Sequence, residues 1–230
     1  MGGMASKTIT LTYDPQATWS LPTQVRWKDV LQVQDAVQVV DGQWFLSDAG
    51  IRPVHPAYDR LVVIGDRTWR DYGIRVTVTL HGFVPGPQGQ LQGGFGILTR
   101  WNGHYADAFQ PSREWRPSGA IGWYRARWED KPPRYRNFNI SDAVIEDREM
   151  VASPPMALPP NSTVVMQMEV RSQAGSPSRY DYQVWQPENP DALLCNLTTR
   201  GTPGESPAGS VLLIALYADV TIGDIEGYPL

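Results

Sequence analysis

Cysteine is almost absent from this sequence, since Cys195 is the only one among 230 residues. A single cysteine excludes an internal disulfide and a cysteine-based zinc cage, and we expect it to be a buried structural thiol. Histidine is scarce too: the three histidines (His55, His81 and His104) form no His-x-His or Glu-x-x-His pair. A catalytic transition metal therefore has no support in the sequence.

Long hydrophobic runs and blocks of like charge are also missing. The longest apolar stretch, Val211 to Tyr217, is too short to cross a bilayer, so no membrane insertion is expected. The formal net charge of -4 is spread along the chain without the basic footprint of a nucleic-acid-binding protein. The first residues contain no apolar run of the signal-peptide kind. We expect residues 1–6 to be an added or disordered N-terminus and residues 7–230 to form a single domain.

The sequence also lacks the hydrophobic periodicity of an α-helix. No window of helical length keeps apolar residues at a 3.6-residue period without a Pro or Gly, whereas period-two alternation recurs throughout. The chain has 21 glycines and 20 prolines, which separate the short apolar runs as turns do. About a dozen strands without a long helix predict an all-β sandwich or barrel. The main expected strands are 7–12, 60–64, 72–83, 95–101, 120–128, 163–171, 179–186, 192–198, 211–217 and 220–225, and residues 37–46 carry an Asp41-Gly42 turn signal between two β-rich pieces.

Three stretches in the second half carry a family resemblance. They are GGFGILTRW at 93–101 with Tyr105, RYDYQVW at 179–185, and GSVLL at 209–213 followed by DVTIGDI at 219–225. In this order they resemble the concanavalin A-like lectin/glucanase superfamily, which includes bacterial laminin-G-like (LamG-like) modules and legume-type lectins. The resemblance implies a two-sheet antiparallel jelly-roll sandwich, a concave sheet whose loops form a ligand face, and an N-terminal strand near the C-terminal one.

Aromatic and planar polar side chains are concentrated in residues 100–128, which hold four of the nine tryptophans. Sugars present flat C–H faces that stack on aromatic rings, and hydroxyl rims that need planar polar partners. The sequence therefore predicts a lectin-like module that binds a poly- or oligosaccharide. The expected ligand-binding residues are Arg100, Trp101, Asn102, His104, Tyr105, Gln110 and Trp115. Trp123 and Trp185 lie in strand patterns and are expected in the core.

Two other functions stay open. Glycosidases of this fold carry Glu-x-Asp-x-Glu on one strand, so that both carboxylates face the sugar; this motif is missing, which favours a non-catalytic protein. The glutamates of Glu146-Asp147-Arg148-Glu149 would point to opposite faces of a strand. A hydrolase using carboxylates such as Asp107 or Glu114, or a polysaccharide lyase, is the first alternative. The lyase ingredients are Gln92, Arg100, His104, Gln110 and Tyr124. A structural or protein-interaction module of a larger surface protein is the second alternative.

No cofactor is required by this reading, but the resemblance implies one metal candidate. Jelly rolls of this superfamily often bind a structural Ca²⁺ near the junction of the first and last strands, through one carboxylate and several backbone oxygens. Asp224 would supply the carboxylate and the Asp41-Gly42 turn a carbonyl. A solvent-facing Asp224 without a metal is the alternative. The expected partner is carbohydrate, and the expected location is extracellular or cell-surface if the chain belongs to a longer secreted protein.

Overall fold

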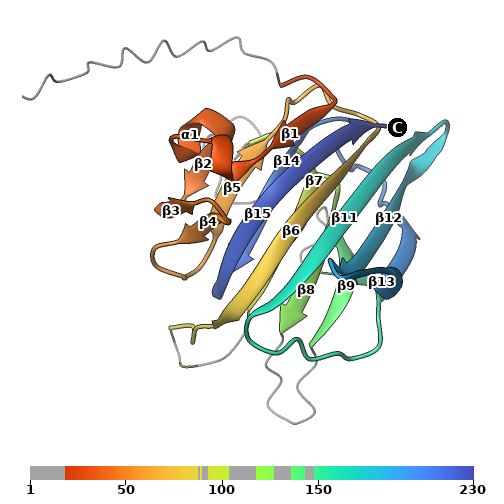
Figure 1. Cartoon of the computed structure of the whole chain (residues 1–230). Coiled ribbons are helices and arrows are strands. Elements are labelled where there is room, and N and C mark those ends of the chain that lie inside the picture. The colour runs from red at the N-terminus through yellow and green to blue at the C-terminus, as the bar shows by residue number, and fades with distance from the viewer. Residues whose placement is uncertain (1–18, 88, 90–92, 104–117, 127–135, 143–147) are drawn as a thin grey trace, which may run out of the picture.

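Two antiparallel sheets form the protein. The computed structural model describes residues 19–87, 89, 93–103, 118–126, 136–142 and 148–230. In these residues, sheet A has eight strands in the order β13-β12-β11-β6-β15-β4-β3, with β1 paired to β15, and sheet B has seven in the order β10-β9-β8-β7-β14-β5-β2. Figure 1 shows sheet A toward the viewer and sheet B behind it. The all-β sandwich expected from the sequence is confirmed.

The bounds of the elements are as follows. Sheet A contains β1 (Thr23–Val25), β3 (Trp44–Ser47), β4 (Gly50–Pro53), β6 (Tyr72–Phe83), β11 (Ser162–Gln173), β12 (Ser176–Gln186), β13 (Asn189–Arg200) and β15 (Ala218–Pro229). Sheet B contains β2 (Gln38–Asp41), β5 (Arg60–Ile64), β7 (Gly93–Trp101), β8 (Ala120–Ala126), β9 (Arg136–Asp142), β10 (Glu149–Ala152) and β14 (Ser210–Leu216). Helix in the described residues is limited to the 3₁₀ turn η1 (Trp27–Asp29) and the short α1 (Val33–Ala36). No described helix has the length and hydropathy needed to cross a membrane.

Period-two burial explains why these segments are strands. In β6, Ile74, Val76, Val78 and Leu80 are buried while the residues between them are partly exposed. Alternate side chains of a strand point to opposite faces, so this pattern places one face of β6 against sheet B. Equivalent faces of the other central strands complete the core between the sheets. Cys195 is buried in that core, as expected.

The Asp41-Gly42 turn expected from the sequence lies between the two strands β2 and β3. Gly42 has a φ of +84°, a conformation that glycine adopts without steric cost. However, β2 before the turn pairs with β5 in sheet B, and β3 after it pairs with β4 in sheet A. The turn therefore carries the chain from one sheet to the other and does not close a hairpin.

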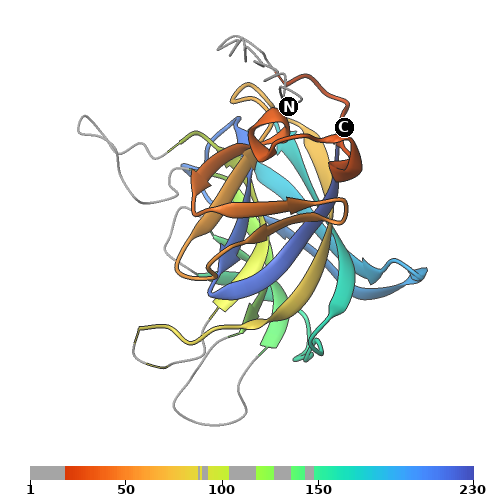
Figure 2. The same ribbon diagram turned by 60° about the vertical axis from the view of Figure 1, so that its left-hand side comes forward.

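The beginning and the end of the described chain meet in sheet A. Thr23 of β1 pairs with Gly227 of β15, and the indole N–H of Trp27 donates to the backbone oxygen of Gly223 at 2.7 Å. Figure 2 brings this side of the molecule forward and shows the orange strands β3 and β4 beside the blue β15. The strand expected at residues 7–12 lies outside the described residues, so its pairing stays a prediction.

Candidate functional site

The outer face of sheet B, directed away from sheet A, carries a second hydrophobic cluster. Along β5 and β14, its members alternate with residues of the main core, so they point in the opposite direction. The cluster consists of Leu61, Val63, Leu98, Trp101, Ile121, Trp123, Leu212 and Ile214. All eight are buried, which shows that both faces of the central part of sheet B are shielded from water. Trp123 is buried as expected, although it belongs to this outer cluster.

Trp101 and Arg100 end β7, and neither presents an open surface to a ligand. Trp101 is 6% exposed and belongs to the outer cluster. Arg100 is 1% exposed and has a φ of +54°, unusual for a residue with a side chain. Its guanidinium donates to the hydroxyl of Ser178 at 2.7 Å and to that of Ser172 at 2.9 Å, so it ties the end of β7 to sheet A. Both residues are therefore buried side chains that stabilise the end of β7.

Asn102 is half-buried and fixes the chain just after β7. Its side-chain amide donates to the Ser206 hydroxyl at 2.5 Å and to the Ala208 backbone oxygen at 2.9 Å. The backbone N–H of Ser206 in turn donates to the backbone oxygen of Ser118 at 3.1 Å. Residues 102 and 118 stand on either side of the aromatic segment, so Ser206 holds both of its ends at one edge of the sandwich. Sequence reasoning missed this role of Ser206, which no local pattern marks.

The other predicted ligand residues lie outside the described residues. These are His104, Tyr105, Gln110 and Trp115, and the carboxylates Asp107 and Glu114 of the enzyme alternative fall in the same segment. Their role stays a prediction. Of the expected site, the structure brings together Arg100, Trp101 and Asn102 at the point where that segment leaves β7.

A polar network lies beside the outer cluster on β8 and β9. The indole N–H of Trp123 donates to the amide oxygen of Asn139 at 2.7 Å, and the Ser141 hydroxyl donates to the same oxygen at 2.8 Å. The Arg125 guanidinium lies 4.4 Å from the Trp123 ring centroid. Asn139 and Ser141 are fully buried, so their hydrogen bonds order this face. The sequence analysis missed this network, which the Asn-x-Asn-x-Ser alternation at 137–141 could have indicated.

Paired carboxylates are the requirement of the glycosidase alternative. The described strands of sheet B contain three acidic residues, Asp41, Asp142 and Glu149. Asp142 accepts from Arg148 and from Thr202, which follows β13 of the other sheet, whereas Glu149 lies opposite the outward-facing Ser141. Asp142 and Glu149 thus lie on opposite faces. Asp41 is five strands from Asp142, about 24 Å at normal strand spacing, beyond the roughly 5–10 Å that glycoside cleavage uses.

Asp224, the expected calcium ligand, is already paired within the protein. One carboxylate oxygen accepts from the Arg26 guanidinium at 2.7 Å, and the other accepts from the Trp27 backbone N–H at 3.2 Å. No group of three or more His, Cys, Asp or Glu residues in the described parts of the chain is arranged to hold a metal. Asp41 of the proposed carbonyl-donating turn is bonded to Arg60. The donor set at Asp224 therefore fits a guanidinium and does not fit Ca²⁺.

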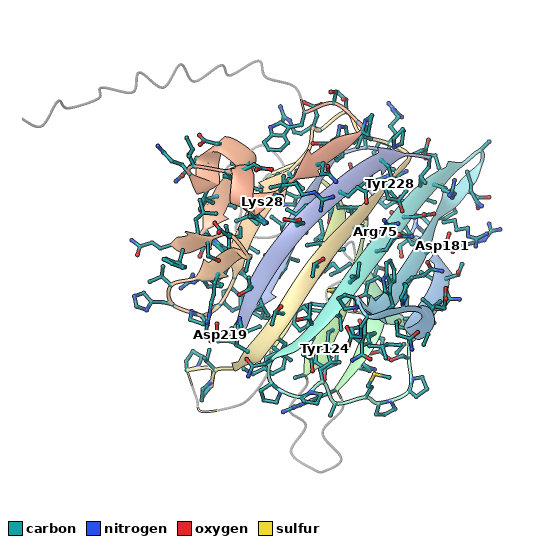
Figure 3. All side chains as sticks on the ribbon, in the orientation of Figure 1. Lys28, Arg75, Tyr124, Asp181, Asp219 and Tyr228 are labelled. Carbon is teal, nitrogen blue, oxygen red and sulfur yellow. The ribbon has the colours of Figure 1, made fainter. Side chains whose placement is uncertain are left out.

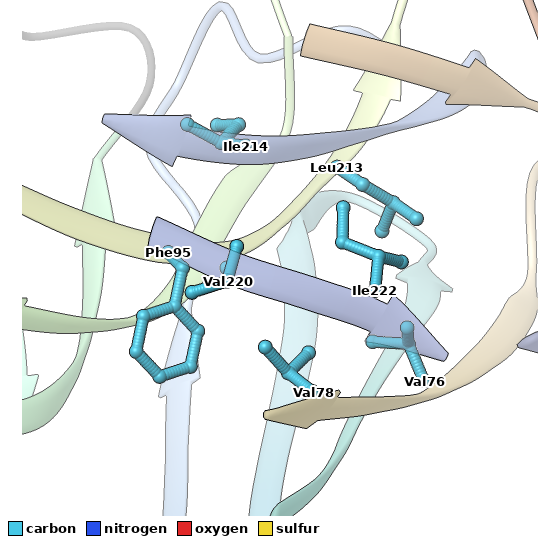
Figure 4. Close-up of a pocket in the computed structure, with 8 residues that line it drawn as sticks. Val76, Val78, Phe95, Leu213, Ile214, Val220 and Ile222 are labelled. Carbon is cyan, nitrogen blue, oxygen red and sulfur yellow. The ribbon is translucent and has the colours of Figure 1, made fainter. Parts of the chain in front are cut away.

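A small cavity between the sheets is a packing feature of the core. Figure 4 shows its apolar lining, which includes Val78, Phe95, Leu213 and Ile222. Its volume is about 10 Å³ and its lining is mainly apolar, which does not suit a water or a sugar hydroxyl. Ligand recognition by the interior is not supported by this cavity.

Comparisons with known proteins agree with the architecture. No family model matches the chain, and no curated protein sequence does. Among solved structures, the VIP36 exoplasmic/lumenal domain with Ca²⁺ and Man3GlcNAc is 11% identical, with a TM-score of 0.57 over 83% of this chain and 82% of that one. The metal-free Emp46p carbohydrate recognition domain is 10% identical, with a TM-score of 0.55 over 89% and 94%. The legume lectin-like domain from Entamoeba histolytica is 9% identical, with a TM-score of 0.51 over 86% and 92%.

The fold is therefore that of the concanavalin A-like, legume-lectin-like jelly rolls. The resemblance expected from residues 93–225 is confirmed at the level of fold. Identities near 10% carry the likeness of the backbone and no more, so the function of this chain has to be argued from its own residues.

Proposed function

We propose that this protein is a non-catalytic, lectin-like domain that binds a poly- or oligosaccharide through the aromatic segment between β7 and β8. The observation that carries the proposal is the fixation of both ends of that segment by Ser206, at Asn102 and at Ser118. A binding loop gains affinity when the scaffold restricts its freedom beforehand. Tyr105 and Trp115 would stack on sugar faces, while Asn102, His104 and Gln110 would bond hydroxyls. Arg100 and Trp101 are buried at the end of β7, where this segment begins.

The fold supports the proposal that the ligand is a glycan. Similar domains include VIP36 in forms described with Man2 and with Man3GlcNAc, and the Emp46p carbohydrate recognition domain. Mannose-containing oligosaccharides are therefore the first ligands to test. The exoplasmic/lumenal placement of the VIP36 domain supports an extracellular, cell-surface or lumenal location for this chain as well.

The test is a glycan array followed by calorimetry with the full chain, in Ca²⁺ and in EDTA. We expect a mannose-containing oligosaccharide to bind, and Trp115→Ala to weaken it about tenfold, since truncating an aromatic anchor typically costs more than 1 kcal/mol. Phe45→Ala is the matched control, because Phe45 is an exposed aromatic on β3 of the other sheet. No response to any glycan, or an unchanged affinity of Trp115→Ala, would overturn the proposal.

The enzyme alternative is separated by a different measurement. A hydrolase releases new reducing ends from the bound glycan, and a lyase produces an unsaturated uronate that absorbs in the ultraviolet. We expect neither product, because the described acidic residues of sheet B form no pair on one face. Product formation that disappears in Asp107→Asn or Glu114→Gln would establish the enzyme instead.

A further inference from the structure

The outer face of sheet A carries a continuous row of planar polar side chains. Cross-strand pairing places them directly opposite one another on five adjacent strands. In spatial order they are Glu226, Arg75, Gln167, Gln183 and Asn196. At normal strand spacing the row is about 19 Å long, which suits an extended chain of small units better than a compact ligand.

Two aromatic rings flank this row. Tyr228 lies over Gly73, where an added Cβ would be 2.2 Å from the ring, and its hydroxyl donates to Glu169 at 3.0 Å. Trp185 lies on the other side, and the Arg75 guanidinium is 5.7 Å from its ring centroid and 5.9 Å from that of Tyr228. Figure 3 shows Arg75 and Tyr228 on the face of sheet A turned to the viewer. The rings are thus held in place before any ligand arrives.

Trp185 corrects a sequence-based expectation. The sequence placed it in the core, but Tyr182 and Val184 of β12 are the buried residues and Trp185 points to the opposite face, where it is partly exposed. Its cross-strand neighbour Leu193 is 41% exposed. Large apolar surface left open next to fixed polar groups is a common mark of binding surfaces.

Three ion pairs lie along the row of planar side chains. Arg75 pairs with Glu226 at 3.0 Å, Arg171 with Glu169 at 2.9 Å and Arg179 with Asp181 at 2.8 Å. These three pairs carry no net charge around the row, and Arg200, which lies opposite Arg179 on β13, adds a positive charge at one end of the face. A polyanion or a polycation would gain little by electrostatic attraction here, so the face favours a neutral ligand.

From this arrangement we propose that the outer face of sheet A is a second binding surface, which takes a linear neutral oligosaccharide lying across the strands. The exposed parts of the Trp185 and Tyr228 rings stack on pyranose faces, and the amides of Gln183 and Asn196 bond the hydroxyls. Gln183 donates to Asn196 at 3.3 Å, which leaves the Gln183 oxygen and the Asn196 N–H groups for the ligand. This surface does not depend on the aromatic segment of sheet B.

The experiment uses calorimetry of the full chain with mannohexaose, cellohexaose and xylohexaose. We expect at least one to bind, Trp185→Ala to weaken it about tenfold, and Trp115→Ala to leave that component unchanged. Gln183→Ala is the second variant, because its partly exposed side chain points away from the core and can be removed without opening it. The thermal midpoint of each variant shows that it is folded.

Any one of the following outcomes would overturn the proposal. The first is that none of the hexasaccharides binds. The second is that binding is unchanged in both Trp185→Ala and Gln183→Ala. The third is that only a sulfated polyanion binds, which would assign the face to charge recognition. The fourth is that sedimentation shows self-association that Trp185→Ala abolishes, which would assign the face to a second copy of the chain. A loss in Trp115→Ala alone would support the sheet B site and count against this one.

Discussion

Asn102 and Ser206 are 104 positions apart, yet the amide of Asn102 donates to the Ser206 hydroxyl at 2.5 Å. The Ser206 hydroxyl itself donates to the Ala208 backbone oxygen at 2.7 Å. Ser206 is 6% exposed, so these bonds lie largely out of water. The loop after β13 thereby holds the start of the aromatic segment against the end of β7.

Removal of this bond should cost both stability and binding. We expect Asn102→Ala to lower the free energy of unfolding by about 1–2 kcal/mol, because the Ser206 and Ala208 groups lose a partner in a partly buried place. Urea denaturation measures the change. Asn189→Ala, an exposed asparagine at the start of β13, is the control and should stay within about 0.5 kcal/mol. Equal stability of the two variants would contradict a stabilising role for the hydrogen bonds of Asn102 to Ser206 and Ala208.

The Arg26–Asp224 ion pair should make the protein indifferent to calcium at this position. Because the carboxylate is already bonded to Arg26 and to the Trp27 N–H, we expect the same thermal midpoint in millimolar Ca²⁺ and in EDTA. Both side chains are more than a third exposed, so Asp224→Asn should cost no more than about 1 kcal/mol. A Ca²⁺-dependent rise in the midpoint that Asp224→Asn abolishes would restore the metal site.

The Cys195 thiol should be unreactive in the folded protein. Burial raises its pKa to about 12, so almost no thiolate exists at pH 8. The folded-state pKa lies above the unfolded value of about 8.5, so the contribution of this group to stability is complete below that pH and is lost as the pH rises toward 12. Alkylation by iodoacetamide at pH 8 should follow the rate of opening of the core and accelerate in urea. Rapid labelling without denaturant would show that the thiol is accessible.

The core around the small cavity should be sensitive to truncation. Ile222 is 3% exposed and lines the cavity, so Ile222→Ala is expected to lower the free energy of unfolding by about 2–5 kcal/mol. Leu31→Ala removes a similar side chain that is 85% exposed, and should change stability by less than about 0.5 kcal/mol. Comparable losses in both variants would mean that the sandwich does not pack as described.

The local pattern of apolar residues predicted most of the strands, although the short β1 and β4 were missed. The sequence places strands at 60–64 and 72–83, the bounds that β5 and β6 have in the structure. Residues 72–83 carry apolar residues at every second position, which can be buried together only in an extended chain, and residues 61–64 form the short apolar run of a strand buried on both faces. The family resemblance in the second half predicted the two-sheet jelly roll. The short α1 was missed, since four residues are too few to establish a helical period.

The alternation of apolar and polar residues does not show what covers each face of a strand. The exposure of the predicted site residues could therefore not be derived from the sequence. Trp101 and Arg100 are residue types that are common in sugar-binding sites. However, Trp101 is buried in the second cluster on sheet B, and Arg100 donates to two serines of sheet A. Trp185 shows the reverse, with a ring expected inside and found outside.

What the sequence determined by itself is therefore most of the longer strands and the all-β class, which follow from residues close together in the chain, and the absence of an internal disulfide, which follows from its single cysteine. The tertiary structure alone decided that Asp224 meets Arg26, that Ser206 meets Asn102, and that Glu226, Arg75 and Gln167 form a row. These contacts join residues about 90 to 200 positions apart. Strand order and register bring them together, and neither is written in the local pattern of side chains.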